Sequence, residues 1–450
     1  MIYLVTKQTN LQDDSYEIIS VEESLKILES LTIVGLDTET TGLNCHKDKL
    51  LSVQLGCKKF QVVIDCTTID IQEYKNYLES DRVFILWNAK FDLKWLYRYH
   101  IVPKNVYDGF LAEKIMWLGY PIVLTVDMWN NIKCDRYDYF PGDSKKDTEA
   151  HYKLQMNLKK AGEMYLGVEL DKSVRGKIIY LGLTPETIAY SANDVKYLED
   201  IKNCQEKLLK EKGLMLAMSY SNKFILALAY MEFCGVKVDI NKWIAKMNKD
   251  NEQLESYKKQ IDEWLIKNDP TSPYITINRQ GNLFEGFDLS PKVTVNWKSN
   301  QQVIPIFKKF GVNLEVLDKK TKKNKDSVDI KVLAPQKDKC SLIPLYIKYK
   351  EMEKQRSSFG ENILKQIDKE SGRLYSRFNP FGTDTCRISS GGKDKAKGIE
   401  YINLLNLPSD AETRACFIAE EGNKWISIDY SGQESFIMAD MANDKEMINE

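Results

Sequence analysis

The stretch Val34-Gly35-Leu36-Asp37-Thr38-Glu39-Thr40-Thr41-Gly42-Leu43 decides how the first part of the chain folds. The apolar run over residues 31–36 predicts a buried strand. The strand leads into two carboxylates, Asp37 and Glu39, which point to the same face because they are two residues apart. Two such carboxylates repel each other unless a cation lies between them, and oxygen ligands suit Mg²⁺ or Mn²⁺. A surface strand with two solvated acids is the alternative that this stretch alone leaves open.

The composition excludes several classes of protein. The chain has 450 residues, too many for one core, so two or three domains are expected. Its 64 Lys and Arg residues balance 65 Asp and Glu residues, so any surface that binds nucleic acid has to be local. No apolar run reaches the roughly 18 residues that a membrane span needs, and the N-terminus lacks a signal-peptide layout. Scattered cysteines without a C-x-x-C pair predict a reducing compartment, such as the cytoplasm.

Helices and strands alternate in the first hundred residues. Ser20-Val21-Glu22-Glu23 is a capping box that predicts the start of a short helix. Buried strands are expected over residues 31–37, 50–55, 60–65 and 82–86. The short connections between the first three predict an antiparallel meander. A helix over residues 87–96 follows, with Asp92 near its start, where a carboxylate is electrostatically favourable. Local sequence leaves capping and catalysis equally open for Asp92.

Two further segments precede residue 213. Residues 134–150 are polar and contain Pro-Gly, so they predict an exposed insertion, and a helix is expected over residues 151–165. Thr184-Pro185 predicts the start of a helix that runs to about Lys212. Tyr190 and Asp194 share one face of that helix, a spacing that is usually surface decoration.

Five residues stand in a characteristic order: Asp37, Glu39, Asp92, Tyr190 and Asp194. The set resembles the DEDD exonuclease superfamily in its tyrosine-containing branch. Asn88-x-x-x-Asp92 resembles the second motif of that superfamily, and Tyr190-x-x-x-Asp194 the third. Ala189 occupies the position where the sister branch carries His, which excludes that branch. The resemblance implies a ribonuclease-H-like α/β domain over residues 1–212 that hydrolyses single-stranded DNA from its 3′ end.

The resemblance also implies a role for each residue. Four carboxylates would hold two Mg²⁺ or Mn²⁺ ions about 4 Å apart, which can hold the attacking and leaving oxygens of a phosphoryl displacement. Tyr190 would orient the attacking water, since a reference pKa of about 10 disfavours a free phenolate at neutral pH. Leu43 matches a position that packs against the terminal base, and Asn88 one near the substrate. Both could equally be ordinary structural residues.

The middle of the chain is predicted to be mainly helical. Helices are expected over residues 223–233, 240–265, 299–311 and 341–368, with a short strand over residues 236–239. Ser299-Asn300-Gln301-Gln302 is a second capping box. Residues 318–326 carry Lys319, Lys320, Lys322, Lys323 and Lys325. A solvated loop and a loop that contacts phosphates both remain open for this segment.

Four pieces near the end of the chain follow in order: residues 383–390, 403–408, 414–417 and 425–434. Together they resemble the family A DNA polymerases of phage type. Asp429 matches the first metal-binding carboxylate of the palm, and Glu434 the residue that crowds the sugar 2′ position. Arg387 matches the residue that reaches the primer terminus, and Asn403 and Asn406 belong to the motif that follows it and are expected to contact DNA or nucleotide.

This second resemblance implies a mainly α thumb over residues 213–378 and the first part of an α+β palm over residues 379–450. Met231-Glu232-x-x-Gly235-Val236-x-x-Asp239 matches the start of the thumb. Primer–template DNA and deoxynucleoside triphosphates would be the substrates, with Mg²⁺ in the polymerase site once it is complete. Residues 425–428 are expected to form a buried palm strand.

The sequence departs from the polymerase pattern in several places. Residues 391–400 look inserted, Ser409-Asp410 replaces a common arginine, and Ser435-Phe436 replaces the usual Leu-Arg. The chain stops at Glu450, before the fingers helix and the second palm motif, so we expect it to need a C-terminal polymerase fragment. A stand-alone ribonuclease D-like exonuclease with a nucleic-acid-binding C-terminal region is the alternative. The acidic segment at residues 429–434 favours the polymerase, because such an appendage does not need it.

Overall fold

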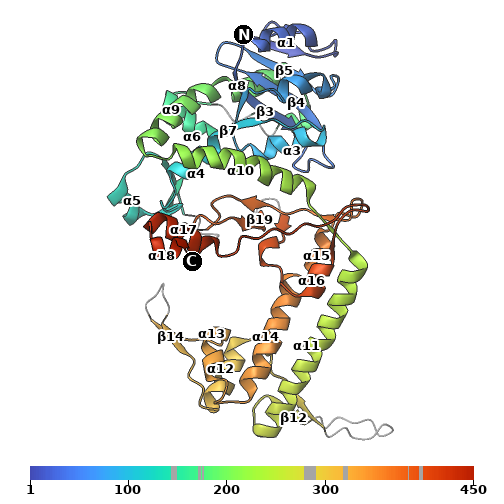
Figure 1. Ribbon diagram of the computed structural model, residues 1–450, viewed down its shortest axis with the longest axis vertical. Coiled ribbons are helices and arrows are strands. Elements are labelled where there is room, and N and C mark those ends of the chain that lie inside the picture. Colours follow the sequence, from blue (N-terminus) through green and yellow to red (C-terminus); the bar gives the residue numbers. More distant parts are fainter. Residues whose placement is uncertain are drawn as a thin grey trace. The chain divides into compact units, whose positions relative to one another are not determined.

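The computed structural model describes residues 1–142, 149–170, 174, 177–277, 290–317, 323–383, 385–394 and 399–449. The chain forms two compact units (Figure 1). The first comprises Met1–Gly235 and Tyr375–Leu405, and the second comprises Val236–Leu374 and Asn406–Glu450. The chain therefore leaves the first unit and returns to it. No helix among the described residues combines the length and the apolar character that a membrane span requires.

A seven-stranded mixed sheet is the centre of the first unit, in the order β2-β1-β5-β4-β3-β6-β7. The strands are β1 (Ile2–Val5), β2 (Glu17–Ile18), β3 (Ile33–Thr40), β4 (Leu50–Gly56), β5 (Gln61–Asp65), β6 (Val83–Leu86) and β7 (Asn105–Asp108). Strands β3, β4 and β5 pair antiparallel, which confirms the predicted meander. The β1–β5, β3–β6 and β6–β7 pairs are parallel.

Helices surround this sheet. The helices of the first unit are α1 (Val21–Glu29), α2 (Lys75–Leu78), α3 (Lys90–Arg98), α4 (Gly109–Met116), α5 (Val126–Ile132), α6 (Leu158–Leu166), α7 (Ile178–Leu181), α8 (Pro185–Lys196), α9 (Leu198–Glu211) and α10 (Met215–Cys234), of which α5 packs on strands β8 (Val123–Thr125) and β10 (His151–Leu154) outside this sheet. The capping box of Ser20 and Glu23 is present at α1, and Thr184 caps α8. The helix predicted to run from Thr184 to Lys212 is divided at Tyr197 into α8 and α9.

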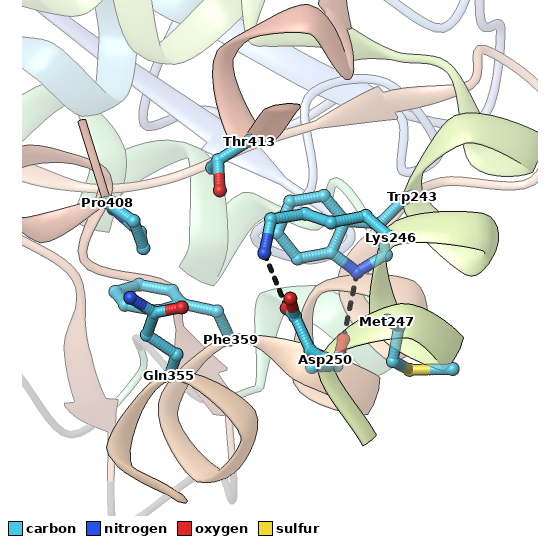
Figure 2. A pocket seen from close by; sticks show the side chains of 9 residues that line it. Trp243, Lys246, Met247, Asp250, Gln355, Phe359, Pro408 and Thr413 are labelled. Atoms are coloured by element: carbon cyan, nitrogen blue, oxygen red, sulfur yellow. Dashed lines mark hydrogen bonds and ion pairs between the residues drawn. The ribbon is translucent and has the colours of Figure 1, made fainter. Parts of the chain in front are cut away.

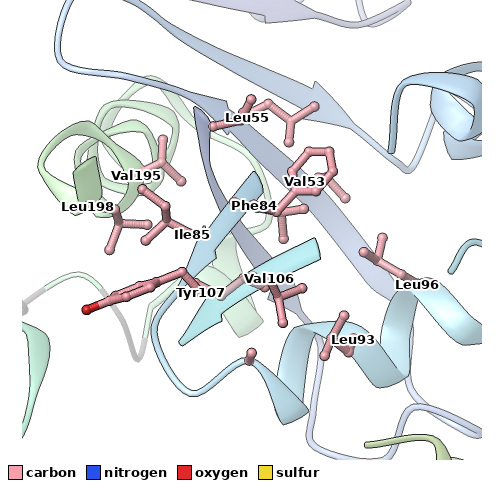
Figure 3. Close-up of a cluster of buried hydrophobic side chains, with 14 of the residues drawn as sticks. Val53, Leu55, Phe84, Ile85, Leu93, Leu96, Val106, Tyr107, Val195 and Leu198 are labelled. Atoms are coloured by element: carbon pink, nitrogen blue, oxygen red, sulfur yellow. The ribbon is translucent and has the colours of Figure 1, made fainter. Parts of the chain in front are cut away.

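The alternation of side chains along the strands places a different set of helices on each face of the sheet. Val34 pairs with Phe84, which pairs with Val106, and this face packs against α3 through Leu93 and Leu96 (Figure 3). The other face carries Gly35, Ile85 and Tyr107 and meets α8 and α9, whose Val195 and Leu198 are buried there (Figure 3). Asp37 and Glu39 have the same parity as Gly35, so they lie on the α8 face.

The return segment of the first unit is attached through Glu232 of α10. This carboxylate accepts hydrogen bonds from Lys90 Nζ (2.5 Å) and Lys94 Nζ (2.9 Å) of α3 and from the Phe378 backbone N–H (2.8 Å). Burial works to raise the pKa of Glu232, but the two lysines outweigh it and hold the pKa below its usual value. Helix α3, which carries Asp92, is thereby tied to α10 and to residues 375–405. The strands of that return segment are β17 (Phe378–Asn379), β18 (Ser389–Ser390), β19 (Gly392–Asp394) and β20 (Ile399–Tyr401).

The prediction of an exposed insertion at 134–150 and a helix at 151–165 is wrong in part. β9 (Tyr137–Phe140) and β10 (His151–Leu154) form an antiparallel sheet with β8 (Val123–Thr125). Alternating apolar side chains bury one face of these strands, and Arg136, 1% exposed, forms an ion pair with the buried Glu113 of α4. Such alternation favours a strand over a loop even in a polar segment. Residues 143–148 of this insertion lie outside the described part of the chain.

Two long helices, α11 (Ile240–Asn268) and α14 (Leu342–Ser358), dominate the second unit and pack against each other. The other helices are α12 (Asn300–Lys309), α13 (Ile330–Leu333), α15 (Gly360–Gln366), α16 (Ala411–Ala415), α17 (Gln433–Ala442) and α18 (Lys445–Asn449). The strands are β11 (Val236–Val238), β12 (Ile275–Ile277), β13 (Pro291–Val293), β14 (Glu315–Leu317), β15 (Asn324–Asp326), β16 (Arg373–Leu374) and β21 (Phe417–Ile418). The predicted helix over 341–368 is divided at Phe359 into α14 and α15.

The structure corrects one prediction for the thumb-like region and describes only part of the segment on which another depends. The Ser299 side chain makes no capping hydrogen bond at α12. The second bond of the predicted capping box is also replaced, because Gln302 Oε1 accepts from the Asn296 backbone N–H (2.6 Å) and the Ser299 backbone N–H donates to the Asn296 carbonyl (2.9 Å). Lys323 and Lys325 lie at the β14–β15 hairpin, whereas Lys319, Lys320 and Lys322 fall outside the described residues.

The predicted buried strand over residues 425–428 is also wrong. Trp425, Ile426 and Ile428 are 62%, 79% and 85% exposed, and the segment has no strand conformation. A strand requires a neighbour for its backbone N–H and C=O groups. None of the described strands pairs with this segment, so its apolar composition does not produce a strand.

Candidate metal and active site

The candidate site begins with a close approach of α8 to β3. A Cβ added to Gly35 would lie 2.6 Å from the Val195 carbonyl oxygen, so a side chain cannot be accommodated at this position. The missing side chain lets the helix backbone lie directly on the strand. Asp194, the residue before Val195, is therefore brought next to the carboxylates that follow Gly35 on the same face.

Three carboxylates converge at this contact. Oxygen atoms of Asp37, Glu39 and Asp194 all lie within 4.8 Å of one another. Asp194 is 9% exposed, and Asp37 and Glu39 are half-buried. Partly buried carboxylates at such separations repel one another strongly unless a cation compensates their charge. The donor set is all oxygen, which fits a hard divalent cation such as Mg²⁺ or Mn²⁺.

Tyr190 lies one helical turn before Asp194 on α8 and is 6% exposed. Residues four apart on a helix share a face, so its phenol lies on the side of α8 that carries Asp194. The structure therefore places four of the five predicted residues on two neighbouring elements, β3 and α8.

Asp92, the fifth residue, comes from the opposite face of the sheet. Its Oδ1 accepts a hydrogen bond of 2.6 Å from Thr38 Oγ1, and Thr38 lies between Asp37 and Glu39 with opposite parity. Asp92 is 2% exposed, and burial raises the pKa of its carboxyl well above the usual range. Asp92 thus contacts Thr38, which lies between two members of the group of three, but Asp92 itself does not belong to the group.

Asp108 is a structural residue of this site that sequence reasoning missed. Its carboxylate accepts backbone N–H groups of Asn88 (2.9 Å), Ala89 (3.0 Å), Phe110 (3.0 Å) and Leu111 (3.3 Å). Asp108 thereby caps α4 and also fixes the turn before α3, where Asn88 has a φ of 69°. A position just before a helix suggests a cap, but its bonds to residues 88 and 89 depend on the β6–β7 pairing.

The remaining predicted contact residues lie at the surface. Leu43 is 46% exposed, and Asn88 is exposed at the start of α3. Arg387, exposed, and Asn403, half-buried, belong to the first unit, and Asn406, exposed, belongs to the second.

Asp429 and Glu434 are also exposed and precede or begin α17 in the second unit. Among the described residues, one group of at least three His, Cys, Asp or Glu side chains has ligand atoms close enough to hold a metal ion. Its members are Asp37, Glu39 and Asp194. Asp429 is not brought together with such ligands.

A small pocket in the second unit is separate from these acids (Figure 2). It is lined by Trp243, Lys246, Asp250 and Phe359, among others. Lys246 Nζ pairs with the Asp250 carboxylate (2.5 Å), and Trp243 Nε1 donates to the Gly360 carbonyl (3.0 Å). Lys246, Asp250 and Trp243 are thus engaged within the protein, and among the described residues the pocket holds no group of metal-ligating side chains.

Comparisons with known proteins assign both regions. Residues 16–210 match the 3′–5′ exonuclease family, and residues 285–450 match DNA polymerase family A. DNA polymerase I of Aquifex aeolicus is 27% identical over 95% of this chain and 63% of that protein. DNA polymerase I of Borreliella burgdorferi is 24% identical over 96% of this chain and 42% of that protein. The chain therefore spans less than two thirds of the length of these relatives.

A solved structure shows the same fold at low sequence identity. The polymerase domain of Pol1 from M. smegmatis, in complex with DNA primer-template and dNTP, superimposes with a TM-score of 0.61 and 16% identity. The match covers 95% of this chain and 62% of that one.

The chain therefore carries a 3′–5′ exonuclease domain with a group of three carboxylates and a partial family A polymerase domain. The curated relatives that it resembles along almost its whole length are DNA polymerase I proteins. The predicted 3′–5′ exonuclease domain and the predicted family A polymerase domain are thereby confirmed. The phage type and the DEDD superfamily with its tyrosine-containing branch stay predictions.

Proposed function

We propose that this chain removes nucleotides from the 3′ end of single-stranded DNA by hydrolysis with two divalent ions, Mg²⁺ or Mn²⁺. The observation that supports this most directly is the convergence of Asp37, Glu39 and Asp194 within 4.8 Å. The order of these residues with Asp92 and Tyr190 fits the exonuclease family that matches residues 16–210. In a polymerase such an activity removes misincorporated nucleotides, which is proofreading.

Each side chain has a proposed task. Asp37, Glu39 and Asp194 would hold one cation, and Asp92 would contribute to a second. The bound ions supply Lewis-acid stabilisation of the phosphate and an activated water. Tyr190 would orient that water by a hydrogen bond, since its phenol lies one turn from Asp194. Leu43, exposed just after β3, would pack on the terminal base, and Asn88 would lie beside the substrate.

The experiment uses the purified chain and a single-stranded DNA oligonucleotide labelled at its 5′ end. We expect stepwise shortening from the 3′ end in Mn²⁺ or Mg²⁺ and none in EDTA. An RNA oligonucleotide of the same sequence tests the ribonuclease D-like alternative, and faster cleavage of RNA would favour that alternative. Intact DNA in the presence of Mn²⁺ would disprove the proposed exonuclease.

We also propose that the polymerase region acts on primer–template DNA and deoxynucleoside triphosphates after further polypeptide completes it. Asp429 would hold Mg²⁺ together with carboxylates from that polypeptide, and Glu434 would crowd the sugar 2′ position. Arg387 would reach the primer terminus, with Asn403 and Asn406 close to DNA or nucleotide. The exposure of Trp425, Ile426 and Ile428 supports this, because a strand that pairs with residues 425–428 would cover these apolar side chains.

A nucleotide-incorporation assay tests this second proposal. It should use the Asp37→Ala background, so that degradation cannot hide synthesis. We expect no template-directed extension by this chain and extension when a C-terminal polymerase fragment is supplied. Extension by the chain alone would show that the required ligands come from elsewhere in it.

We place the protein in the cytoplasm, of the host if it comes from a phage, because its cysteines are all free thiols.

A further inference from the structure

The carboxylates of β3 face a polar pair on the neighbouring strand. In the antiparallel register of β3 and β4, Asp37 lies opposite Gln54 and Glu39 lies opposite Ser52. Residues directly opposite each other share a face, with Cβ atoms about 5 Å apart. Gln54 and Ser52 are both 0% exposed, whereas most polar side chains of this size lie at the surface. Two buried polar side chains therefore lie beside the two acids on the same face of the sheet.

The Gln54 amide is only half satisfied by the protein. Its Nε2 donates to Ser52 Oγ at 2.6 Å. Its Oε1 is fully buried and accepts no hydrogen bond from the residues that the structure describes. A buried acceptor without a donor has lost its hydrogen bond to water without a replacement, which is unfavourable. A carbonyl oxygen beside carboxylates also adds negative potential to a site that already carries several negative charges.

A hydrated divalent cation at the carboxylates would satisfy this oxygen. Mg²⁺ usually keeps several of its waters when protein carboxylates bind it, and those waters donate strong hydrogen bonds. Groups that accept such bonds outside the ligand shell affect metal affinity by roughly 10–100-fold. Gln54 is placed to accept such a hydrogen bond, because it lies opposite Asp37 in the register of β3 and β4 and is buried from bulk water.

We propose that Gln54 is a positioning residue of the cation site, whose Oε1 accepts a hydrogen bond from a cation-bound water. Ser52 fixes the amide in this orientation by accepting from Nε2. The inference rests on the proposed function and deepens it, because it assigns an outer ligand shell to β4, a strand that contributes no residue to the carboxylate motif.

A rotated amide is the competing arrangement. Exchange of the amide oxygen and nitrogen would make Ser52 the donor and let Nε2 donate toward Asp37. Gln54 would then act on the carboxylate as a donor rather than on the water as an acceptor. Gln54→Glu separates the two, since an ionised glutamate offers acceptors of nearly the same shape and no donor.

The test measures Mn²⁺ binding to the full chain by isothermal titration calorimetry, after EDTA treatment and without DNA. We expect Gln54→Leu to weaken Mn²⁺ binding by roughly 10–100-fold. Gln54→Glu should bind Mn²⁺ at least as tightly as the parent. Gln205→Leu is the matched control, because Gln205 is also 0% exposed but donates to Gly109 and Glu113, neither of which belongs to the group of Asp37, Glu39 and Asp194. Its Mn²⁺ affinity should equal that of the parent.

The outcomes are distinguishable. Unchanged affinity in Gln54→Leu, or a loss in Gln54→Glu as large as in Gln54→Leu, would overturn the assignment of Oε1 as an acceptor. Circular dichroism in EDTA checks that each variant is folded. If Gln54→Leu does not fold, Gln54→Asn replaces it, because the shorter amide cannot reach the same water and should also weaken binding. A parent chain that binds no Mn²⁺ would refute the cation site itself and this inference with it.

Discussion

Two segments of the chain pair an apolar run with acidic residues, and they have opposite fates. In β3, Val34 and Leu36 are 0% exposed, and Asp37 and Glu39 are fixed beside Asp194. In the segment 425–434, apolar side chains are exposed and no strand forms. The difference is the neighbours: β3 lies between β4 and β6, whereas no described strand pairs with residues 425–430. An apolar run becomes a strand only when adjacent strands satisfy its backbone.

The same difference decides where carboxylates can act together. On β3 the pleat sets the parity of Asp37 and Glu39, and the close packing of α8 at Gly35 supplies Asp194. Asp429 lies in an exposed segment that pairs with no described strand, so no sheet fixes the direction of its side chain. A metal site requires several ligands held at defined positions. The first region brings three carboxylates together in this way, whereas Asp429 belongs to no such group among the described residues.

The largest effect is expected from removing the β3 acids. Asp37→Ala combined with Glu39→Ala should abolish cleavage of single-stranded DNA, because two of the three converging ligands are lost. Burial of the core is unaffected, so the far-UV circular dichroism should match that of the parent. Full activity in this double variant would mean that the cation site lies elsewhere and that the comparison of the two segments has no functional meaning.

Tyr190→Phe should have the next largest effect. Removing the hydroxyl should lower the cleavage rate by about 10²–10⁴-fold or less, the range typical of a group that assists proton transfer. Mn²⁺ affinity, measured by calorimetry, should not change, because the ligands remain. A loss of Mn²⁺ affinity would assign Tyr190 to metal binding instead of water orientation.

The spacing of residues predicted much of this site from sequence. Strand parity placed Asp37 and Glu39 on one face, and helical periodicity placed Tyr190 with Asp194, because both are properties of a few consecutive residues. Gln54 could not be found in this way. Its position opposite Asp37 depends on the register of β4, which pairs residues far apart in the chain. Asp108 was missed for the same reason.

The failures of sequence reasoning also have physical causes. The insertion sheet was missed because residues 134–150 are polar overall, although Tyr137 and Leu154 are buried in its strands. The strand at 425–428 was wrongly expected because apolar composition reports a tendency to be buried and not the presence of a partner. The predicted capping box at Ser299 is not formed, and its Gln302 side chain accepts from the Asn296 backbone N–H instead, a contact that the local motif does not predict.

Truncating one apolar side chain in each of the two segments should lower the free energy of unfolding by very different amounts. Leu36→Ala removes a side chain that is 0% exposed and should lower the free energy of unfolding by about 2–5 kcal/mol. Ile428→Ala changes a side chain that is 85% exposed and should stay within about 0.5 kcal/mol of the parent. Urea unfolding in EDTA measures both without a contribution from bound metal. Equal destabilisation by the two changes would show that the segment 425–430 is packed in solution.

The smallest effect is expected from Asp429→Asn. An isolated carboxylate exposed to water binds divalent cations weakly, since it must replace tightly held hydration without help from further ligands. Among the described residues, Asp429 is outside the one group of converging acids. The variant should therefore match the parent in the number of Mn²⁺ ions bound and in the rate of DNA cleavage.

Calorimetry with Mn²⁺ measures the number of ions, and the matched change Asp37→Asn provides the contrast. Asp37→Asn should lose metal affinity and activity, because its carboxylate lies within 4.8 Å of the other two. If Asp429→Asn removed one bound Mn²⁺ from this chain, Asp429 would already have partner ligands. The exposed segment would then be a formed metal site, and the contrast with β3 would be wrong. If both variants behave as expected, Asp429 gains a function only when a pairing strand orients it, and the same substitution should abolish synthesis in the completed polymerase.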